Sequence, residues 1–250
     1  MGEDKCSFSA AECTVCILAG GAGSRLRPVV SDRQKAAAEV AGEPFVCRIV
    51  RRIVAAGARR IVLCVGYKAE SVEAALAPGF PGVNILFSRE PVPLGTAGAV
   101  RLALDRCAIE TPRIAVLNGD SWFDADFGEF LRLSAADPAA LMLAEVDNVL
   151  RYGRVMLMPD SQRILKFEEK GNFSGAGMIN AGVYHFDVEV LRQAIPAGRP
   201  VSFEREIFPR LAAEGRLFGY PRAGAFIDIG TPESYREAQE MFLKRSDNHG

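Results

Sequence analysis

Short apolar runs alternate with amphipathic segments through the first half of the chain. Uninterrupted runs of strand length lie at 14–18, 61–65, 83–87 and 114–117. The segments between them that predict helices lie at 44–57, 69–76 and 95–106. Such an alternation is typical of a parallel β-sheet with helices on both faces.

The pattern changes after about residue 137, where strand-like runs separated by turn residues dominate. These runs lie at 140–146, 154–158, 163–168 and 178–186, and they predict an antiparallel or mixed extension of the sheet. A helix over 202–213, distorted at Pro209, a strand near 225–229 and a closing helix from Pro232 complete the prediction. We therefore expect a single α/β domain over 1–250, with an N-terminal portion at 14–137 and a C-terminal portion at 138–245.

The composition is that of an ordinary globular protein of 250 residues, 49% hydrophobic and 24% charged. A net charge of -1 argues against nucleic acid or an anionic membrane as the main partner. No apolar run approaches the ~18 residues of a membrane span, and the acidic start is unlike a signal peptide. We expect a cytoplasmic protein. The sequence does not decide between a monomer and a homo-oligomer.

The chain has six cysteines, and no second pair or nearby His completes a zinc site. Cys13 and Cys16 have C-x-x-C spacing, but residues three apart on a strand point to opposite faces. We expect reduced, mostly buried cysteines. The two histidines, with no plausible Ser or Cys partner, make a hydrolase triad an unattractive interpretation.

The first apolar run is followed by a cluster of small and basic residues, namely Gly20, Gly21, Gly23, Ser24 and Arg25. Glycines leave room for backbone N–H groups to turn around an anion, and an Arg fork suits phosphate oxygens. A dinucleotide fingerprint would need a glycine where Leu26 stands, and a P-loop would need Gly-Lys. The remaining alternative to a phosphate-binding loop is a glycine-rich turn with a structural role only.

Two carboxylates are placed unusually. Asp120 follows an apolar strand, and Asp228 is isolated between Ile227 and Ile229. A carboxylate in apolar surroundings is costly unless it is paired or metal-bound. Two acids near a phosphate suit Mg²⁺, which binds carboxylates together with substrate phosphates. Alternatively, Asp228 caps the helix at Pro232 or pairs with an arginine.

Two further motifs lie in the C-terminal portion. The 167–170 segment, Phe-Glu-Glu-Lys, offers adjacent opposite charges at a strand end. Its Lys could neutralise a phosphate while the carboxylate accepts hydroxyl hydrogen bonds, although a solvated strand end is the more common outcome. In Asn180-Ala-Gly182, a glycine inside a strand often marks close approach of a ligand.

Taken in order, these motifs resemble the sugar-1-phosphate nucleotidyltransferases, and the match covers about 14–243. The matching stretches are 18–28 with Lys35, 94–99, 118–120, 167–170, 180–182 and 227–232. The runs at 29–32, 118–123 and 202–209 look most like D-glycero-α-D-manno-heptose 1-phosphate guanylyltransferases. The resemblance implies the nucleotidyltransferase fold, a Rossmann-like, predominantly parallel mixed sheet with helices on both faces.

The same resemblance implies roles for individual residues. Catalytic roles fall on Arg25, Lys35, Asp120 and Asp228, with Mg²⁺ held by the two aspartates. Nucleotide-binding residues would be Leu18, Ala19, Gly20, Gly21, Gly23, Ser24, Arg25, Glu90, Gly95, Thr96, Asn118 and Gly119. Sugar-phosphate-binding residues would be Tyr152, Gly153, Glu169, Lys170, Asn180 and Gly182. The 14–137 portion would thus bind nucleotide and the 138–245 portion sugar phosphate.

The segment around Lys35 and the residue Glu90 differ from what is common in the family. The family usually flanks its Lys as Pro-Lys-Pro, whereas this chain has Gln34-Lys35-Ala36, which predicts a looser loop around Lys35. Glu90 stands where relatives that use uracil, thymine or adenine commonly have Gln. A carboxylate only accepts hydrogen bonds, and guanine presents N1–H and N2–H₂ side by side, so we hypothesise GTP as the donor.

The resemblance therefore implies transfer of GMP from GTP to a heptose 1-phosphate. The products would be pyrophosphate and a GDP-heptose for a bacterial surface polysaccharide such as capsule, lipopolysaccharide or S-layer glycan. Another sugar 1-phosphate, of mannose or glucose, is the nearest alternative. A catalytically silent regulatory homologue that binds nucleotide-sugar is a second. A dinucleotide-dependent oxidoreductase is disfavoured by Leu26.

Overall fold

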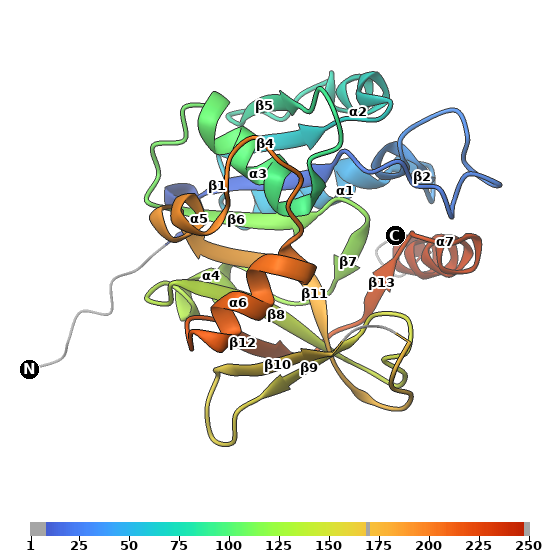
Figure 1. Ribbon diagram of the computed structural model, residues 1–250. Coiled ribbons are helices and arrows are strands. Elements are labelled where there is room, and N and C mark those ends of the chain that lie inside the picture. Colours follow the sequence, from blue (N-terminus) through green and yellow to red (C-terminus); the bar gives the residue numbers. More distant parts are fainter. Residues whose placement is uncertain (1–8, 169–170, 248–250) are drawn as a thin grey trace, which may run out of the picture.

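A seven-stranded mixed sheet forms the centre of the protein, seen in a computed structural model that describes residues 9–168 and 171–247 (Figure 1). Its strand order is β12-β8-β11-β6-β1-β4-β5. The strands are β1 (Thr14–Ala19), β4 (Arg60–Val65), β5 (Asn84–Arg89), β6 (Arg113–Asn118), β8 (Ala139–Val146), β11 (Gly177–Asp187) and β12 (Phe218–Arg222). The N-terminal strands β1, β4, β5 and β6 are mutually parallel, while β11 runs antiparallel to β6 and β8. The predicted mixed, mostly parallel sheet is confirmed.

Helices cover both faces of this sheet, because strand residues alternate between two apolar cores. One core joins the sheet to α1 (Phe45–Ala55), α2 (Ala69–Leu76), α4 (Phe127–Leu133) and α7 (Pro232–Asp247). The other joins it to α3 (Gly95–Arg106), α5 (Val188–Ala194) and α6 (Phe208–Ala213). Cys13 lies in the first core and Cys16 in the second, as their spacing predicts. The five described cysteines are free thiols, four of them buried.

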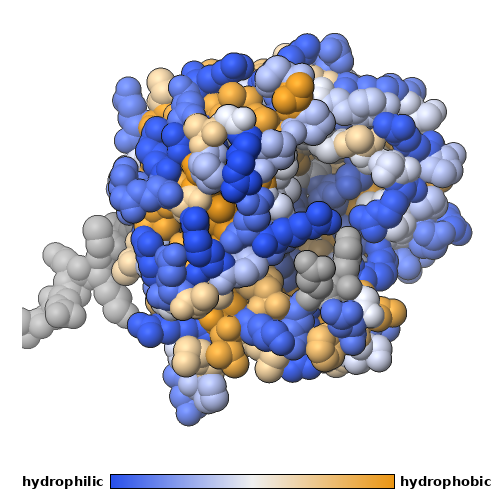
Figure 2. Space-filling model, in the orientation of Figure 1, coloured by the Kyte–Doolittle hydropathy of each residue, from blue (hydrophilic) through white to orange (hydrophobic). Residues whose placement is uncertain are grey.

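Short elements complete the fold and help to build the site. Lys35–Ala37 forms a single 3₁₀ turn. The two-stranded pairs are β2 (Glu39–Val40) with β3 (Glu43–Pro44), β9 (Arg154–Leu157) with β10 (Ile164–Glu168), and β7 (Ser121–Phe123) with β13 (Phe226–Asp228). The last pair joins the segment after β6 to a strand near the C-terminus. Hydrophilic side chains cover most of the face seen in Figure 2.

The structure differs from the sequence prediction in its shortest elements. α4, α5, β7 and β12 were not predicted. The predicted helix over 202–213 is divided into a π-helical turn at Phe203–Ile207 and α6, with Pro209 in the first turn of α6. Pro209 comes just after the π-helical turn, where the α-helical hydrogen-bond pattern is already interrupted. Among the helices described, none combines the length and apolar character that crossing a membrane requires.

Candidate active site

A cavity of about 650 Å³ opens at the carboxyl ends of β1, β4, β5 and β6. Its volume is within the usual range of ligand sites, and open α/β sheets bind ligands at this edge. The predicted residues that line it are Leu18, Gly20, Gly21, Lys35, Glu90, Gly95, Thr96, Asn118, Gly119 and Asp120. Ten of the predicted nucleotide and catalytic residues thus share one cavity.

Several glycines in and beside this cavity either have close neighbours or adopt a φ that favours glycine. A Cβ on Gly119 would lie 2.6 Å from the carbonyl oxygen of Leu18, which already accepts the Gly119 N–H at 2.9 Å. A Cβ on Gly20 would collide with the Glu90 carboxylate. Gly23 has a φ of +59°, a conformation that favours glycine. The loop therefore keeps its backbone exposed to the cavity, as a phosphate-binding loop requires.

The Lys35 ammonium forms an ion pair with Asp120 Oδ2 inside this cavity. The hydroxyl of Ser121 donates to Asp120 Oδ1 at 3.1 Å. Burial by itself would raise the pKa of Asp120. The charge of Lys35 and the hydrogen bonds outweigh burial, so that the pKa lies below its usual value. Asp120 is therefore a carboxylate at neutral pH.

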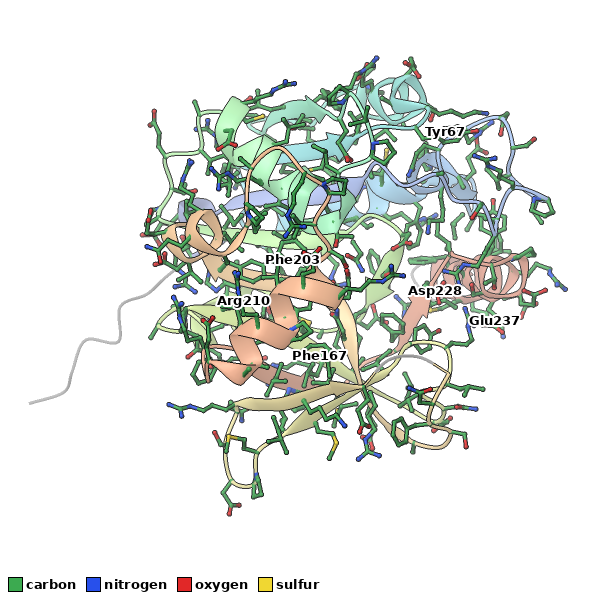
Figure 3. The ribbon with its side chains drawn as sticks, viewed as in Figure 1. Tyr67, Phe167, Phe203, Arg210, Asp228 and Glu237 are labelled. Carbon is green, nitrogen blue, oxygen red and sulfur yellow. The ribbon has the colours of Figure 1, made fainter. Side chains whose placement is uncertain are left out.

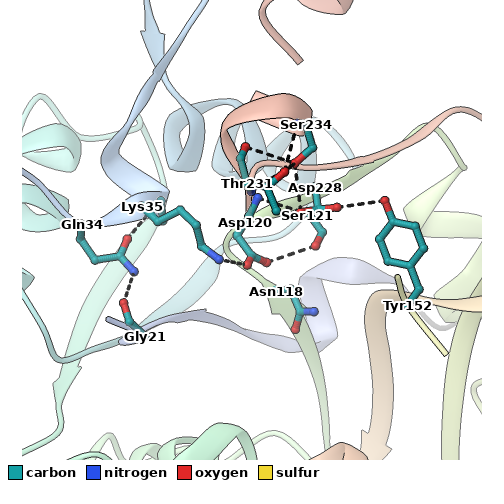
Figure 4. Close-up of polar contacts among 12 residues, drawn as sticks. Gly21, Gln34, Lys35, Asn118, Asp120, Ser121, Tyr152, Asp228, Thr231 and Ser234 are labelled. Carbon is teal, nitrogen blue, oxygen red and sulfur yellow. Dashed lines mark hydrogen bonds and ion pairs between the residues drawn. The ribbon is translucent and has the colours of Figure 1, made fainter. Parts of the chain in front are cut away.

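The segment that carries Lys35 is not the loose loop that the missing prolines suggest. The Gln34 side chain is buried, its Nε2 donates to the Gly21 carbonyl at 3.2 Å, and its Oε1 accepts the Ala36 N–H. The backbone N–H of Gln34 donates to Ser71 Oγ at 2.9 Å. Figure 4 shows the side chain of Gln34 between Gly21 and the turn that begins at Lys35. Hydrogen bonds thus hold the segment that proline rings would otherwise stiffen.

Asp228 reaches the same region through the pairing of β13 with β7. Asp228 lies opposite Ser121, and the Ile229 N–H donates to the carbonyl of Asp120 at 2.9 Å. Figure 3 shows Asp228 where β13 leads into α7. Asp228 Oδ2 accepts hydrogen bonds from Tyr152 and Arg151, both at 3.0 Å. The arginine pairing weighed as an alternative from the sequence is therefore present.

The two aspartates suit Mg²⁺ in donor chemistry. Asp120 and Asp228 lie on paired segments, between Lys35 and Tyr152 in Figure 4. Within the described part of the chain, no group of three or more His, Cys, Asp or Glu forms a metal site. The protein would thus supply two carboxylates, and substrate phosphates the other ligands, which is the combination Mg²⁺ favours.

The predicted sugar-side residues lie next to this cavity. Tyr184 OH donates to Asn118 Oδ1 at 3.4 Å and accepts from Asn180 Nδ2 at 3.1 Å. Gly182 has a φ of +74°, and a Cβ there would lie 2.8 Å from Asn118 Nδ2. Gly182 therefore packs against Asn118, which lines the cavity, and Asn180 is linked to Asn118 through the hydroxyl of Tyr184.

Several predicted residues lie elsewhere. Ala19 is buried in β1, and Gly23 and Ser24 follow the loop without lining the main cavity. Arg25 extends toward the other aspartate, since a Cβ on Gly230 would lie 3.6 Å from its Nη2. Tyr152 contacts Asp228, and Gly153 has a φ of +81° beside it. The predicted residues Glu169 and Lys170 lie outside the described residues.

The structure adds residues that the sequence did not single out. Glu204 lines the cavity and accepts hydrogen bonds from Thr96 Oγ1 at 2.9 Å and Ser202 Oγ at 2.7 Å. Gln34 and Tyr67 line it as well. Thr96 and Glu204 are 108 positions apart, and no local spacing signals their contact.

Glu90 lies in the wall of the cavity, after the end of β5. Its Oε2 accepts the Leu94 N–H at 2.8 Å. Burial raises the pKa of Glu90, and the hydrogen bond from Leu94 opposes part of that rise. The second oxygen, Oε1, lies against Gly20 at the cavity surface. Glu90 thus lines the cavity at the β5 end, separated from the β6 end by β1 and β4.

Comparison with known proteins decides the family. Residues 14–245 match the family model described as nucleotidyl transferase. The chain belongs to the nucleotidyl transferase family. The resemblance seen in the sequence is thus confirmed for the family, and the glycine loop, Lys35 and Asp120 form the candidate active site of this nucleotidyl transferase.

Curated relatives and solved structures agree with this assignment. The chain is 33% identical over 231 residues to a mannose-1-phosphate guanylyltransferase catalytic subunit beta of Dictyostelium discoideum, covering 91% of this chain and 64% of the relative. It is 35% identical over 224 residues to a mannose-1-phosphate guanylyltransferase of Mycobacterium tuberculosis, and the match covers 88% of this chain and 61% of that relative. This nucleotidyl transferase thus spans less than two thirds of the length of these relatives. The fold is similar to the structure of HddC from Yersinia pseudotuberculosis complexed with GMP-PN, with a TM-score of 0.81 and 33% identity. The match covers 92% of this chain and 99% of HddC.

Proposed function

We propose that the protein is a sugar-1-phosphate guanylyltransferase that transfers GMP from GTP and releases pyrophosphate. The observation that carries this proposal is the arrangement of one cavity, in which a glycine loop, the Lys35–Asp120 pair and Glu90 face the same space. The preferred acceptor is D-glycero-α-D-manno-heptose 1-phosphate. The GDP-heptose would then serve bacterial surface polysaccharide synthesis, with the reaction taking place in the cytoplasm.

The reaction needs alignment and charge stabilisation more than proton transfer. A sugar 1-phosphate is already an anionic nucleophile, so its oxygen can attack the α-phosphorus of GTP without a general base. Backbone N–H groups of the loop at Gly20 and Gly21 would hold the departing pyrophosphate, and Arg25 would add a bidentate contact. Lys35 would place a positive charge on the phosphates, where negative charge develops in the transition state.

The two aspartates would hold Mg²⁺, which supplies charge neutralisation between the phosphates when bound. Asp120 and Asp228 are held for this role from two sides. Ser121 donates to Asp120, and Tyr152 donates to Asp228. The β7–β13 pairing fixes the distance between the two backbones. The chain's own residues thus set the position of both carboxylates before substrate arrives.

Guanine selection would depend on Glu90. Burial raises the pKa of Glu90. Its Oε1 lies next to Gly20, a residue that lines the cavity. As a carboxylate it would accept hydrogen bonds from guanine N1–H and N2–H₂, which a Gln amide cannot do equally well. The names of the mannose-1-phosphate guanylyltransferase relatives and the GMP-PN bound to HddC support this choice of base.

Mannose 1-phosphate is the second candidate acceptor. The curated relatives favour it by their names, at 33–35% identity over about nine tenths of this chain. The heptose assignment is favoured by the sequence runs at 29–32, 118–123 and 202–209. The sugar would bind beside Asn180, Gly182 and Tyr152, next to the nucleotide cavity.

A pyrophosphate-release assay tests the proposal. The protein is incubated with Mg²⁺ and each of GTP, UTP, ATP and dTTP, against the 1-phosphates of heptose, mannose and glucose. We expect release with GTP and the heptose phosphate, and none with Asp120→Asn. Asp160→Asn is the matched control, because Asp160 is exposed in a turn and Asn tolerates its φ of +53°. Lack of turnover with every pair would refute the proposal.

A further inference from the structure

Gln34 is a buried polar residue directly before Lys35. The residue is only 2% exposed, and a buried amide is costly unless its donors and acceptors find partners. Both ends of this amide do so. Nε2 donates to the Gly21 carbonyl in the glycine loop at 3.2 Å, and Oε1 accepts the Ala36 N–H. One side chain therefore joins the glycine loop to the turn that carries Lys35.

The backbone of Gln34 already has the geometry of a proline. Its φ is −70° and its ψ is 145°, and a pyrrolidine ring fixes φ near −65°. Here the angle is held by hydrogen bonds. The Gln34 N–H donates to Ser71 Oγ at 2.9 Å, and that hydroxyl donates to the Lys68 carbonyl at 2.7 Å. Noncovalent contacts thus impose the conformation that proline would impose covalently.

These contacts leave Lys35 little freedom. The bond from Ala36 N–H to Gln34 Oε1 caps the 3₁₀ turn that starts at Lys35, and Ala37 N–H donates to the Gln34 carbonyl at 2.9 Å. A Cβ on Gly23 would lie 3.3 Å from Lys35 Cβ, so the loop packs directly on the lysine stem. The ammonium then pairs with Asp120.

We propose that Gln34 is the positioning residue of the candidate active site, which locks the glycine loop and Lys35 to each other. This inference rests on the proposed function of the cavity as a nucleotide site. Gln34 makes no chemical contribution of its own. It sets where the Lys35 ammonium stands relative to the loop that receives the phosphates, so that one substrate meets both at once.

Chemical reactivity of Lys35 tests this positioning without any turnover. The protein is treated with acetic anhydride, and acetylation of Lys35 is measured by peptide mass spectrometry relative to Lys166, whose side chain is 63% exposed. Loss of the Gln34 hydrogen bonds in Gln34→Ala should release Lys35 from Asp120 and accelerate its acetylation about tenfold. Gln34→Pro should accelerate it as well, because the ring fixes φ but removes the amide that bonds Gly21 and Ala36 and the N–H that bonds Ser71.

Ser134→Ala is the control for a merely structural role. The Ser134 hydroxyl is buried, donates to the Phe130 carbonyl at 2.7 Å and contacts His185 Nδ1 at 2.8 Å. It lies near Arg113, at the opposite end of β6 from the cavity. Ser134→Ala should lower the melting temperature as Gln34→Ala does, while leaving Lys35 acetylation unchanged.

Turnover gives a second readout. With GTP and the sugar 1-phosphate, Gln34→Ala and Gln34→Pro should each lower kcat about tenfold, with the KM for the sugar 1-phosphate unchanged in both. If the wild type transfers no GMP, the proposed function fails and the acetylation rates still judge the role of Gln34. Acetylation of Lys35 at the wild-type rate in Gln34→Ala or in Gln34→Pro would overturn the inference.

Discussion

Lys35 and Asp120 form an ion pair across 85 positions of sequence, inside the cavity at the carboxyl edge of the sheet. The pair joins the segment after the glycine loop to the strand end that carries the candidate metal ligand. Because the side chain of Asp120 is only 30% exposed, its charge depends on this partner more than a surface carboxylate would.

This pair predicts a pH dependence of stability. The pKa of Asp120 lies below its ordinary value of 3.8 in the folded protein, so the unfolded chain binds the proton more readily. The contribution is fully present above that ordinary value and is lost as pH falls through the lowered folded-state pKa. Urea unfolding of Asp120→Asn between pH 3 and 7 should therefore show a shallower acid decline than the wild type. Asp160→Asn should keep the wild-type slope, and identical slopes for all three would contradict the assignment.

Glu90→Gln should alter the choice of nucleotide. Removing an acceptor that guanine N1–H and N2–H₂ require should lower kcat/KM for GTP about tenfold or more, while that for UTP falls less. In the wild type, the KM for GTP should also rise as pH falls toward the Glu90 pKa, which burial raises above 4.5. Glu90→Gln should lose this rise. Glu110→Gln, an exposed position, serves as the control, and an unchanged GTP preference in Glu90→Gln would remove Glu90 from base recognition.

Gly182→Ala should impair the site beyond the strain of its backbone. Gly182 and Gly79 have nearly equal φ values, +74° and +72°, but a Cβ on Gly182 would lie 2.8 Å from Asn118 Nδ2 while one on Gly79 meets open space. Both substitutions should cost about 1 kcal/mol of folding stability through strain. Only Gly182→Ala should also lower kcat/KM, since it displaces Asn118. Equal kinetics for the two variants, measured beside their melting curves, would count against a role for Gly182 at the site.

Tyr152→Phe should weaken the hold on Asp228. The lost hydrogen bond, at 3.0 Å, is worth about 1 kcal/mol, or roughly a fivefold decrease in kcat/KM for the sugar 1-phosphate. The KM for GTP should change little. Tyr220→Phe is the matched control, because its hydroxyl bonds Asp137 at 2.6 Å and the Leu133 carbonyl at 3.1 Å, away from the cavity. If both variants turn over alike, Tyr152 does not position the aspartate.

The strands and helices read from sequence were those with a strong local signal. Ala69–Leu76 and Gly95–Arg106 have the predicted bounds, because apolar spacing and flanking turn residues determine them locally. Strand β12 carries Gly219 and Pro221, which argue against a strand. It forms nevertheless because it lies at the edge of the sheet, where a missing N–H is tolerated. Edge position is a tertiary property that sequence does not reveal.

The candidate site was predictable in its parts but not in its connections. The glycine loop and Asp120 follow apolar strands, so their place at one sheet edge follows from the fold. The bond from Gln34 to Gly21 and that from Thr96 to Glu204 depend on how loops pack. The segment around Lys35 is an example. The absence of prolines predicts a looser loop, but the buried amide of Gln34 holds the segment by hydrogen bonds that the sequence does not indicate.

Pairing of β7 with β13 also sets when the site is completed during protein synthesis. The glycine loop and Lys35 leave the ribosome before Asp120. Asp228 is made 108 residues after Asp120 (228 − 120), and β13 can dock on β7 only once that stretch has emerged. A nascent chain therefore carries only one of the two carboxylates until β13 pairs with β7.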